Sequence, residues 1–323
     1  MGPQGPQGPQ GEQGIPGNDG TPGVAGTAGC IECHNLDTKY EVTYQYEGSV
    51  HATGSTAARS SSTSCAPCHS KQGFIETQYT GADKTVNGFP YPTRIDCGAC
   101  HSFHETLELA EAPDYALRTT DPVELLMYRA AGMDPVTVDL GDASNLCANC
   151  HQPRTAPPVD NGSGEFTVTS THYGPHHGPQ TTIMQGLGGY EIAGVDYPNE
   201  TPHTKASSCV TCHMHDGDHE FEPSLASCNT TECHNGEITT LAANPRQISV
   251  ANLLTTLRDE LELAGLLEED LETGEFHPVT GTYPIDQVGA LYNYETIVDD
   301  RSMGVHNFKY VEALLQNSIA VFE

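Results

Sequence analysis

The chain has 323 residues, no tryptophan, 36% hydrophobic residues and a formal net charge of −30, from 43 acidic and 13 basic residues. Such a charge repels nucleic acid and anionic lipid, so we expect neither as a partner and attribute the charge mainly to solubility outside the cell. No run of about 18 apolar residues occurs, which excludes a membrane-spanning helix at the level of sequence. With 33 glycines and 22 prolines, side chains alone make a poor core, so we expect another apolar group to fill the middle.

The N-terminal stretch, residues 1–29, carries glycine at every third position from Gly2 to Gly29. This collagen-like G-X-Y pattern favours an extended polyproline II conformation. It allows two interpretations, a flexible extracellular linker or an arm that packs on neighbouring subunits. We therefore treat residues 1–29 as a separate arm.

The twelve cysteines form six pairs, and each pair is followed at once by histidine. The pairs are Cys30 and Cys33, Cys65 and Cys68, Cys97 and Cys100, Cys147 and Cys150, Cys209 and Cys212, and Cys228 and Cys233. A disulfide framework or C-x2-C zinc sites would use an even set of cysteines, but neither requires the adjacent histidine. Five C-x-x-C-H motifs and one C-x4-C-H motif instead indicate covalent attachment of c-type haem.

The chemistry of haem attachment explains this spacing. Two thiols add to the two vinyl groups of one porphyrin, and the adjacent histidine becomes the proximal ligand of the iron. The predicted proximal ligands are His34, His69, His101, His151, His213 and His234. Six haem c groups would supply the missing apolar surface, and their attachment requires export from the cytoplasm.

Ten further histidines are available as second axial ligands, whereas only six methionines are present. This ratio favours bis-histidine ligation of all six irons, with about four histidines left as solvated loop residues. His104 follows the third motif closely, His203 precedes the fifth, His219 lies before the sixth, and His51 lies between the first two. The segment 171–180, THYGPHHGPQ, adds three histidines, although six irons do not need all of them.

The expected fold is mainly irregular, with short α-helices and little β-structure, packed around a chain of haems. Residues 30–240 form the hexahaem-binding region, in which we expect helices at His104 and at 121–132. Residues 241–323 form a helical C-terminal segment that packs on the haem region, with helices near 248–268, 285–299 and 308–320. The loop sequence GVHN places His306 between the last two helices.

Three stretches, CVTCHM with its following HEF, PHHGPQ, and DDRSMGVHNFKYVEALL, resemble the framework of bacterial multihaem c-type cytochromes related to ammonia-forming nitrite reductases. The resemblance covers roughly residues 140–320. It implies that His176, His219 and His306 are distal ligands, and that His203 is an active-site residue or a ligand. Because six irons do not need all three histidines of 171–180, we favour His176, with His177 as the first substitute and His172 as a residue that supports a ligand or lies at the surface.

Nitrite reductases of this group have a catalytic motif that ends in lysine, whereas every motif here ends in histidine. The acidic, loop-rich chain and its arm look more similar to extracellular filament-forming "nanowire" cytochromes. That resemblance implies stacked haems, a homopolymer and a distal histidine donated to the next subunit, for which His51 is the candidate.

We therefore expect an extracellular or cell-surface electron conduit with no catalytic residues, which passes electrons to other redox proteins or extracellular acceptors. The periplasm is the alternative location. A reductase of nitrogen or sulfur oxyanions with one open haem is the alternative function, and a haem-bearing structural or adhesive protein is a third. High-spin ferric haem would distinguish the reductase from the conduit.

Overall fold

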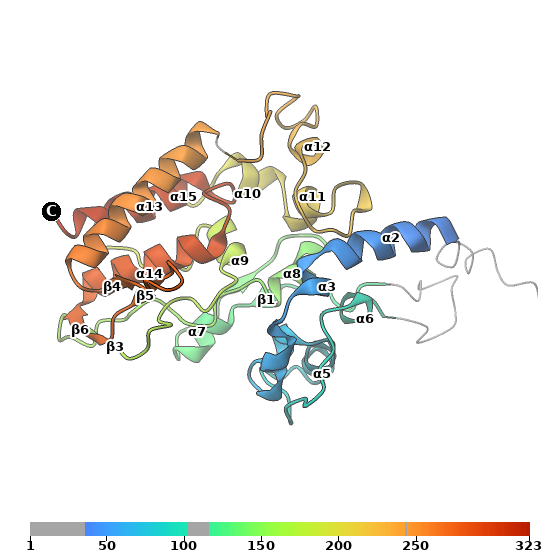
Figure 1. The fold of residues 1–323 in the computed structure, drawn as a ribbon, viewed down its shortest axis with the longest axis horizontal. Coiled ribbons are helices and arrows are strands. Elements are labelled where there is room, and N and C mark those ends of the chain that lie inside the picture. Colours follow the sequence, from blue (N-terminus) through green and yellow to red (C-terminus); the bar gives the residue numbers. More distant parts are fainter. Residues whose placement is uncertain (1–35, 103–115, 243) are drawn as a thin grey trace, which may run out of the picture.

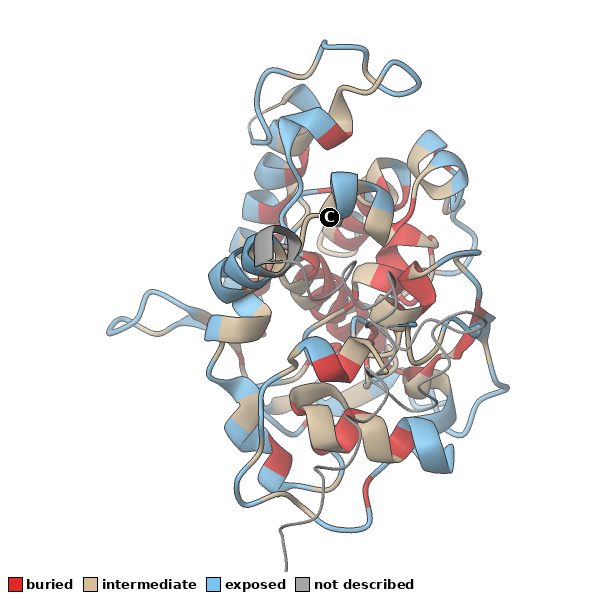
Figure 2. Ribbon diagram, turned by 90° about the vertical axis from the view of Figure 1, so that its right-hand side faces the viewer, coloured by how far each residue is buried: buried red, intermediate tan, exposed pale blue. Residues whose placement is uncertain are grey.

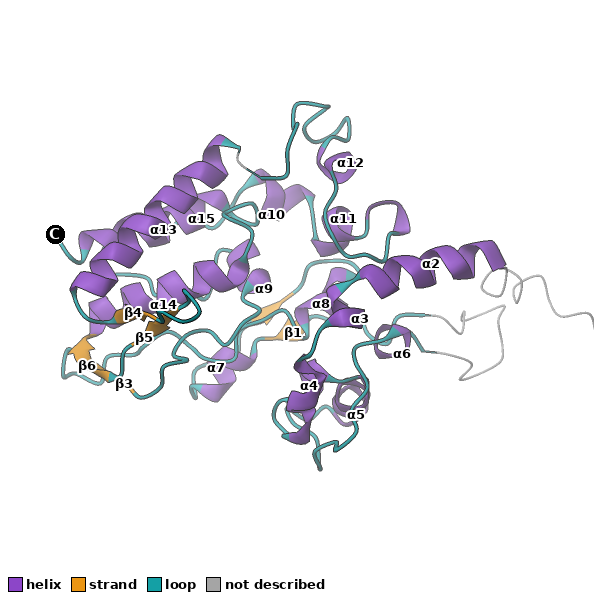
Figure 3. Cartoon of the chain, in the orientation of Figure 1, coloured by secondary structure: helices purple, strands orange, loops and turns teal. Residues whose placement is uncertain are grey.

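The computed structural model describes residues 36–102, 116–242 and 244–323. Short helices joined by long loops make up most of these residues, and the few strands are short and separate (Figure 3). This confirms the predicted fold class of short helices with little β-structure. The arm and the helix expected at His104 lie outside the described residues. So do four of the predicted haem-binding residues, which are Cys30, Cys33, His34 and His104.

The haem-motif half of the chain contains mainly helices of one or two turns. Its elements are α2 (Leu36–Gly48), α3 (Val50–Thr53), η1 (Thr56–Ser61), α4 (Ala66–His69), α5 (Lys71–Thr80), α6 (Cys97–Cys100), β1 (Val123–Glu124), α7 (Leu126–Ala130), β2 (Thr137–Val138), α8 (Ser144–Ala148), β3 (Glu165–Val168), α9 (Gln180–Met184), α10 (Pro202–Ala206), α11 (Cys209–His213), η2 (His215–Gly217) and α12 (Leu225–Cys228). Helix α2 lies at the opposite side of the molecule from the C-terminus (Figure 1).

The C-terminal segment contains longer elements, which pack together at one end of the molecule (Figure 1). They are α13 (Pro245–Leu263), β4 (Leu267–Glu269), β5 (Phe276–Pro278), β6 (Gly281–Pro284), α14 (Ile285–Asp300) and α15 (Phe308–Ala320). Helix α13 begins at a capping box, in which the Asn244 side chain accepts hydrogen bonds from the backbone N–H groups of Arg246 and Gln247.

All strand pairs in the described part of the chain are antiparallel and two-stranded. β1 pairs with β2 with Val123 opposite Val138, and β4 pairs with β5 with Leu267 opposite Pro278. β3 pairs with β6 over four residues, from Glu165 opposite Pro284 to Val168 opposite Gly281. The β3–β6 pair joins the haem-motif half to the C-terminal segment.

The main apolar core lies among α13, α14 and α15 and extends to Val168 and Ile183 of the haem-motif half. Buried residues gather on central helices, whereas the outlying loops are exposed (Figure 2). Gly289 of α14 allows the ring of Tyr190 to approach the helix, because a Cβ at this position would lie 2.0 Å from Cδ1 of Tyr190. A smaller core around Leu125 and Met127 supports Ala148 in the fourth cysteine motif.

The structure changes two of the expected helices. The helix predicted at 121–132 begins only at Leu126, because residues 123–124 pair with β2, a contact that local sequence periodicity does not reveal. The helix expected at 248–268 spans 245–263 instead, since the chain turns at Gly265, which has a φ of 72°. The helix expected at 308–320 has those bounds, and the one expected at 285–299 extends by one residue. Within the described ranges, no helix is long and apolar enough to cross a membrane.

Candidate haem sites

Five of the six cysteine motifs lie in described residues, each on or beside a short helix. A helical turn places cysteines three residues apart on one face, which suits two bonds to one macrocycle. Local sequence starts these turns: the Asp96 carboxylate accepts a hydrogen bond from the backbone N–H of Gly98, and Ser208 and Ser224 begin capping boxes. The ten described cysteines are free of disulfide bonds.

The wider sixth motif keeps a backbone contact that the shorter motifs also make. In the second, third and fourth motifs, the histidine N–H donates to the carbonyl of the first cysteine over 2.9–3.2 Å. The N–H of His234 donates to the carbonyl of Cys228 over 3.2 Å in the same way. The two additional residues of C-x4-C-H therefore leave the histidine beside the first cysteine. Cys233 is exposed, whereas Cys228 is half-buried, so the second thiol of this motif is the more accessible one.

Four of the predicted proximal histidines each lie close to a histidine that does not follow a cysteine pair. The ring centroids lie 6.1 Å apart for His51 and His151, 6.5 Å for His101 and His219, 6.0 Å for His203 and His234, and 6.4 Å for His213 and His306. The structure thus brings together predicted ligands that are far apart in the sequence.

These separations match those of two imidazole rings bound on opposite sides of one metal ion. Bonds from a metal to imidazole nitrogen are about 2 Å long, so two imidazoles on opposite sides of one ion have ring centres roughly 6 Å apart. Distance alone is not diagnostic, since His172 and His277 also lie 6.1 Å apart and neither follows a cysteine pair. The four pairs differ from that one because each contains the histidine of a predicted haem-attachment motif.

Hydrogen bonds at Nδ1 orient several of these rings. The Nδ1–H groups of His213, His219 and His203 donate to the carbonyls of Phe221, Gly217 and Val305 over 2.7–2.8 Å. His306 donates to Oδ1 of Asp300 over 2.6 Å, and His151 lies 3.3 Å from Oε1 of Gln180. Because Nδ1 is engaged, Nε2 is the nitrogen left to bind iron, so these residues fit a bis-histidine haem.

Burial lowers the pKa of three of these imidazoles and so favours their neutral form, which is the form that binds a metal. It lowers the pKa of His51 to about 4, with a smaller contribution from His151. Burial also lowers the pKa of His151 and of His213. His306 differs: burial lowers its pKa, but the charge and hydrogen bond of Asp300 outweigh this and raise it.

A guanidinium, that of Arg154, lies near the histidine of the second motif. Burial and the nearby Arg154 lower the pKa of both His69 and His176, and His69 also acts on His176 directly. A guanidinium N–H of Arg154 lies 3.4 Å from Nε2 of His176. His177 instead pairs with Asp299 over 2.9 Å, and this hydrogen bond raises its pKa. His176 and His177 both have positive φ, 68° and 47°.

The cysteine motifs also contact one another. Sγ of Cys68 lies 3.9 Å from the carbonyl of Asn149, and Sγ of Cys150 lies 3.9 Å from the carbonyl of Pro67, so the second and fourth motifs pack reciprocally. The hydrogen bond between these two thiols raises the pKa of Cys150.

The fourth and fifth motifs are neighbours as well. The hydroxyl of Ser144 accepts from the backbone N–H of Val210 over 3.1 Å, and the hydroxyl of Ser208 donates to Asp142 over 2.6 Å. A hydrogen bond between thiols lowers the pKa of Cys209, the first cysteine of the fifth motif, to about 7. The fourth motif therefore contacts two others.

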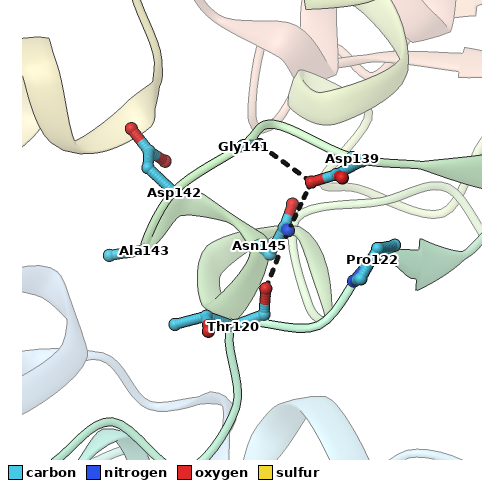
Figure 4. Close-up of a pocket in the computed structure, with 7 residues that line it drawn as sticks. All are labelled: Thr120, Pro122, Asp139, Gly141, Asp142, Ala143 and Asn145. Carbon is cyan, nitrogen blue, oxygen red and sulfur yellow. Dashed lines mark hydrogen bonds between the residues drawn. The ribbon is translucent and has the colours of Figure 1, made fainter.

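A hollow of about 320 Å³ lies beside the fourth motif and is lined without cysteine or histidine (Figure 4). The amide of Asn145 lines it and donates to the carbonyl of Thr120 and to Oδ1 of Asp139, both over 2.9 Å. Asp139 also accepts from the backbone N–H of Gly141. This network fixes the loop that leads into Cys147, so we assign the hollow a supporting role.

Sequence reasoning missed the residues that orient the histidines. Phe221 packs against His51, with ring centroids 5.0 Å apart, and against His219, while its carbonyl accepts from His213. Asp300 and Gln180 were also missed. All three lie within the stretches HEF, DDRSMGVHNFKYVEALL and PHHGPQ, which resemble multihaem cytochromes. Their roles could not be read from those stretches, because each acts on a histidine that its position in the sequence does not indicate.

The fold is similar to that of multihaem cytochromes. The similar structure is described as the "Outer Cell Wall Cytochrome OcwA", with a TM-score of 0.50 and 17% identity, covering 86% of this chain and 50% of that one. The "Undecaheme cytochrome from S-layer of Carboxydothermus ferrireducens" matches with a TM-score of 0.48 and 19% identity, over 85% of this chain and 40% of that one. The chain thus spans about half the length of the OcwA structure and less of the second. No protein-family model and no curated protein matches it.

Proposed function

We propose that this protein transfers electrons through six covalently bound, bis-histidine c-type haems and acts outside the cell. The histidine pairs carry the proposal, because each would saturate one iron and leave no open face for a substrate. Haem supplies the one-electron chemistry, and the chain supplies attachment, orientation and spacing. The contacts of the fourth motif with the second and fifth support close spacing of their haems.

The histidine pairs assign a second axial ligand to the haems of four motifs. His51 serves the fourth motif, His219 the third, His306 the fifth and His203 the sixth. His176 serves the second, and counting leaves His104 for the first, which is attached through Cys30 and Cys33. His51 then acts within its own chain, which replaces its expected donation to a neighbouring subunit. We retain the division into an arm at 1–29, a haem region at 30–240 and a C-terminal segment at 241–323.

Removal of single ligands tests this assignment. His51→Ala is expected to convert one haem of six to a high-spin or ligand-exchanged form, which electron paramagnetic resonance and the visible spectrum would detect. His277→Ala is the matched control, because His277 belongs to the histidine pair without a cysteine motif. Six low-spin haems in His51→Ala would contradict the assignment.

The second motif favours one alternative, a reductase with one open haem. There Arg154 lies within hydrogen-bond reach of Nε2 of His176, the atom that a ligand would use. A guanidinium beside an open iron would suit an oxyanion. A high-spin ferric signal in the wild-type protein that is unchanged in His176→Ala would favour this alternative, whereas its absence would favour the conduit.

We further propose assembly into an extracellular filament, with the arm gathering or joining subunits. The strongly negative charge and the similarity to the structure of OcwA, an outer cell wall cytochrome, support a location at the cell surface. Electron microscopy of the full protein tests assembly, and a field of monomers would contradict it. Deletion of residues 2–29 tests the arm, since unchanged assembly would make it a linker.

A further inference from the structure

Asp300, the last residue of α14, holds a carboxylate in an unfavourable place. Its side chain is 0% exposed, and it lies at the carbonyl end of a helix, where the helix dipole disfavours negative charge. A buried carboxylate is retained only where hydrogen bonds or an opposite charge compensate for lost water. The partners of Asp300 therefore indicate its role.

Both oxygens of Asp300 are engaged within the short loop that follows α14. Oδ1 accepts from Nδ1–H of His306 over 2.6 Å, and Oδ2 accepts from the hydroxyl of Ser302. The Ser302 oxygen in turn accepts from the backbone N–H of His306 over 3.3 Å. These contacts fix His306 at its backbone and at its ring, with the ring facing His213.

The acceptor distinguishes His306 from the other oriented histidines. His213, His219 and His203 donate Nδ1–H to backbone carbonyls, which are neutral. A carboxylate forms a shorter and stronger hydrogen bond, and such a partner raises the basicity of a metal-bound imidazole. His306 is therefore a stronger electron donor at Nε2 than a histidine held by a carbonyl.

We propose that Asp300 is a positioning residue that lowers the reduction potential of the haem held by Cys209, Cys212, His213 and His306. This inference rests on the proposed function. A more basic axial imidazole stabilises ferric over ferrous iron, so the carboxylate favours the oxidised state of this one haem. Asp300 thereby differentiates one site within a series of haems that share the same ligand type.

Asp300→Asn in the full, haem-loaded protein tests the inference. The amide keeps the shape and an acceptor oxygen but removes the charge, so the potential of one haem is expected to rise in a spectroelectrochemical titration, while its signal stays low-spin. Asp299→Asn is the matched control, because Asp299 is the adjacent acid and bonds His177 instead. It is expected to produce a smaller shift at this haem. No rise in Asp300→Asn with all ligands retained, or an equal rise in Asp299→Asn, would overturn the inference.

A second substitution keeps the test decisive if Asp300→Asn does not fold. Ser302→Ala removes the hydroxyl that donates a hydrogen bond to Oδ2 of Asp300. The carboxylate then interacts more strongly with His306, so the reduction potential of this haem is expected to fall. No change or a rise would overturn the inference. His306→Ala separates the two proposals: unchanged low-spin haems would refute the ligand assignment itself. A new high-spin haem in His306→Ala, with Asp300→Asn at wild-type potential, would refute only the role of Asp300.

Discussion

The haem-motif half and the C-terminal segment are organised by different forces. In the C-terminal segment, long helices bury residues such as Leu257, Leu291 and Leu314 completely. In the haem-motif half, helices of about one turn carry histidines that face partners from distant segments. On the proposed function, the difference teaches that one end folds around side chains, whereas the other depends on haems attached through cysteine.

Removal of one haem-attachment motif should have the largest effect, and this effect should be confined to the haem-motif half. Cys147→Ala with Cys150→Ala removes the motif that contacts both the second and the fifth motifs. We expect loss of one haem and loss of hydrogen-exchange protection around the neighbouring motifs, because the short helices there have only the small core around Leu125 and Met127 to hold them. Mass spectrometry would measure both. Residues 285–320 should stay protected, and equal loss there would break the contrast between the two regions.

A cavity in the C-terminal core should have the next largest effect. Leu257→Ala removes a side chain that is 0% exposed on α13, which is expected to cost about 2–5 kcal/mol of unfolding free energy. Leu263→Ala, on the same helix but 85% exposed, should change it by less than about 0.5 kcal/mol. Denaturant unfolding followed in the far ultraviolet measures both. Similar costs for the two variants would show that α13 does not form the core.

Glu295, a buried glutamate of α14 in the C-terminal segment, predicts how the stability of the protein depends on pH. Burial, followed by the charge of Asp299, raises its pKa to about 8, and its Oε1 has no hydrogen-bond partner. The folded state therefore holds a proton that the unfolded state loses near its ordinary pKa. Stability should fall as the pH rises from about 4.5 to about 8, by an amount on the order of a few kcal/mol.

Glu295→Gln should remove this pH dependence and stabilise the protein at pH 8, as measured by the unfolding midpoint across the range. Glu275→Gln, whose side chain is 73% exposed, is the control and should keep the wild-type profile. A profile for Glu295→Gln that matches the wild type would show that another group governs the pH response.

Removal of single helix caps should give the smallest effects, and these effects should differ between the C-terminal segment and the haem-motif half. Asn244→Ala removes the cap of α13 and is expected to cost about 1 kcal/mol. Asp96→Ala removes the cap of α6, but two thioether bonds at Cys97 and Cys100 would already hold that turn. Thermal unfolding of the haem-loaded protein should therefore show a smaller loss for Asp96→Ala. An equal or larger loss would mean that attachment does not order the turn.

The sequence predicted local features well, because these depend on neighbouring residues. The helix at 308–320 follows from its apolar spacing, and the short helices follow from the many glycines and prolines. The start of α13 lies at Asn244 and Pro245, three residues before the expected start, since the cap and not the first apolar residue sets the boundary.

Long-range relations could not be predicted in the same way. Nothing local links His51 to His151, or Glu165 to Pro284, because those contacts depend on how the whole chain packs. The counting argument reduced ten spare histidines to a set of candidates but could not assign them. The role of Asp300 could not be predicted from the sequence, since an acid near a helix end is ordinary until its partner is known.

The histidine pairs also determine where the chain can be divided. In sequence they span 51–151, 101–219, 203–234 and 213–306, and each interval overlaps the next. A cut anywhere between residues 51 and 306 therefore separates at least one histidine from its partner. No fragment of this stretch keeps all of its pairs, so truncation within it would leave at least one histidine without its partner.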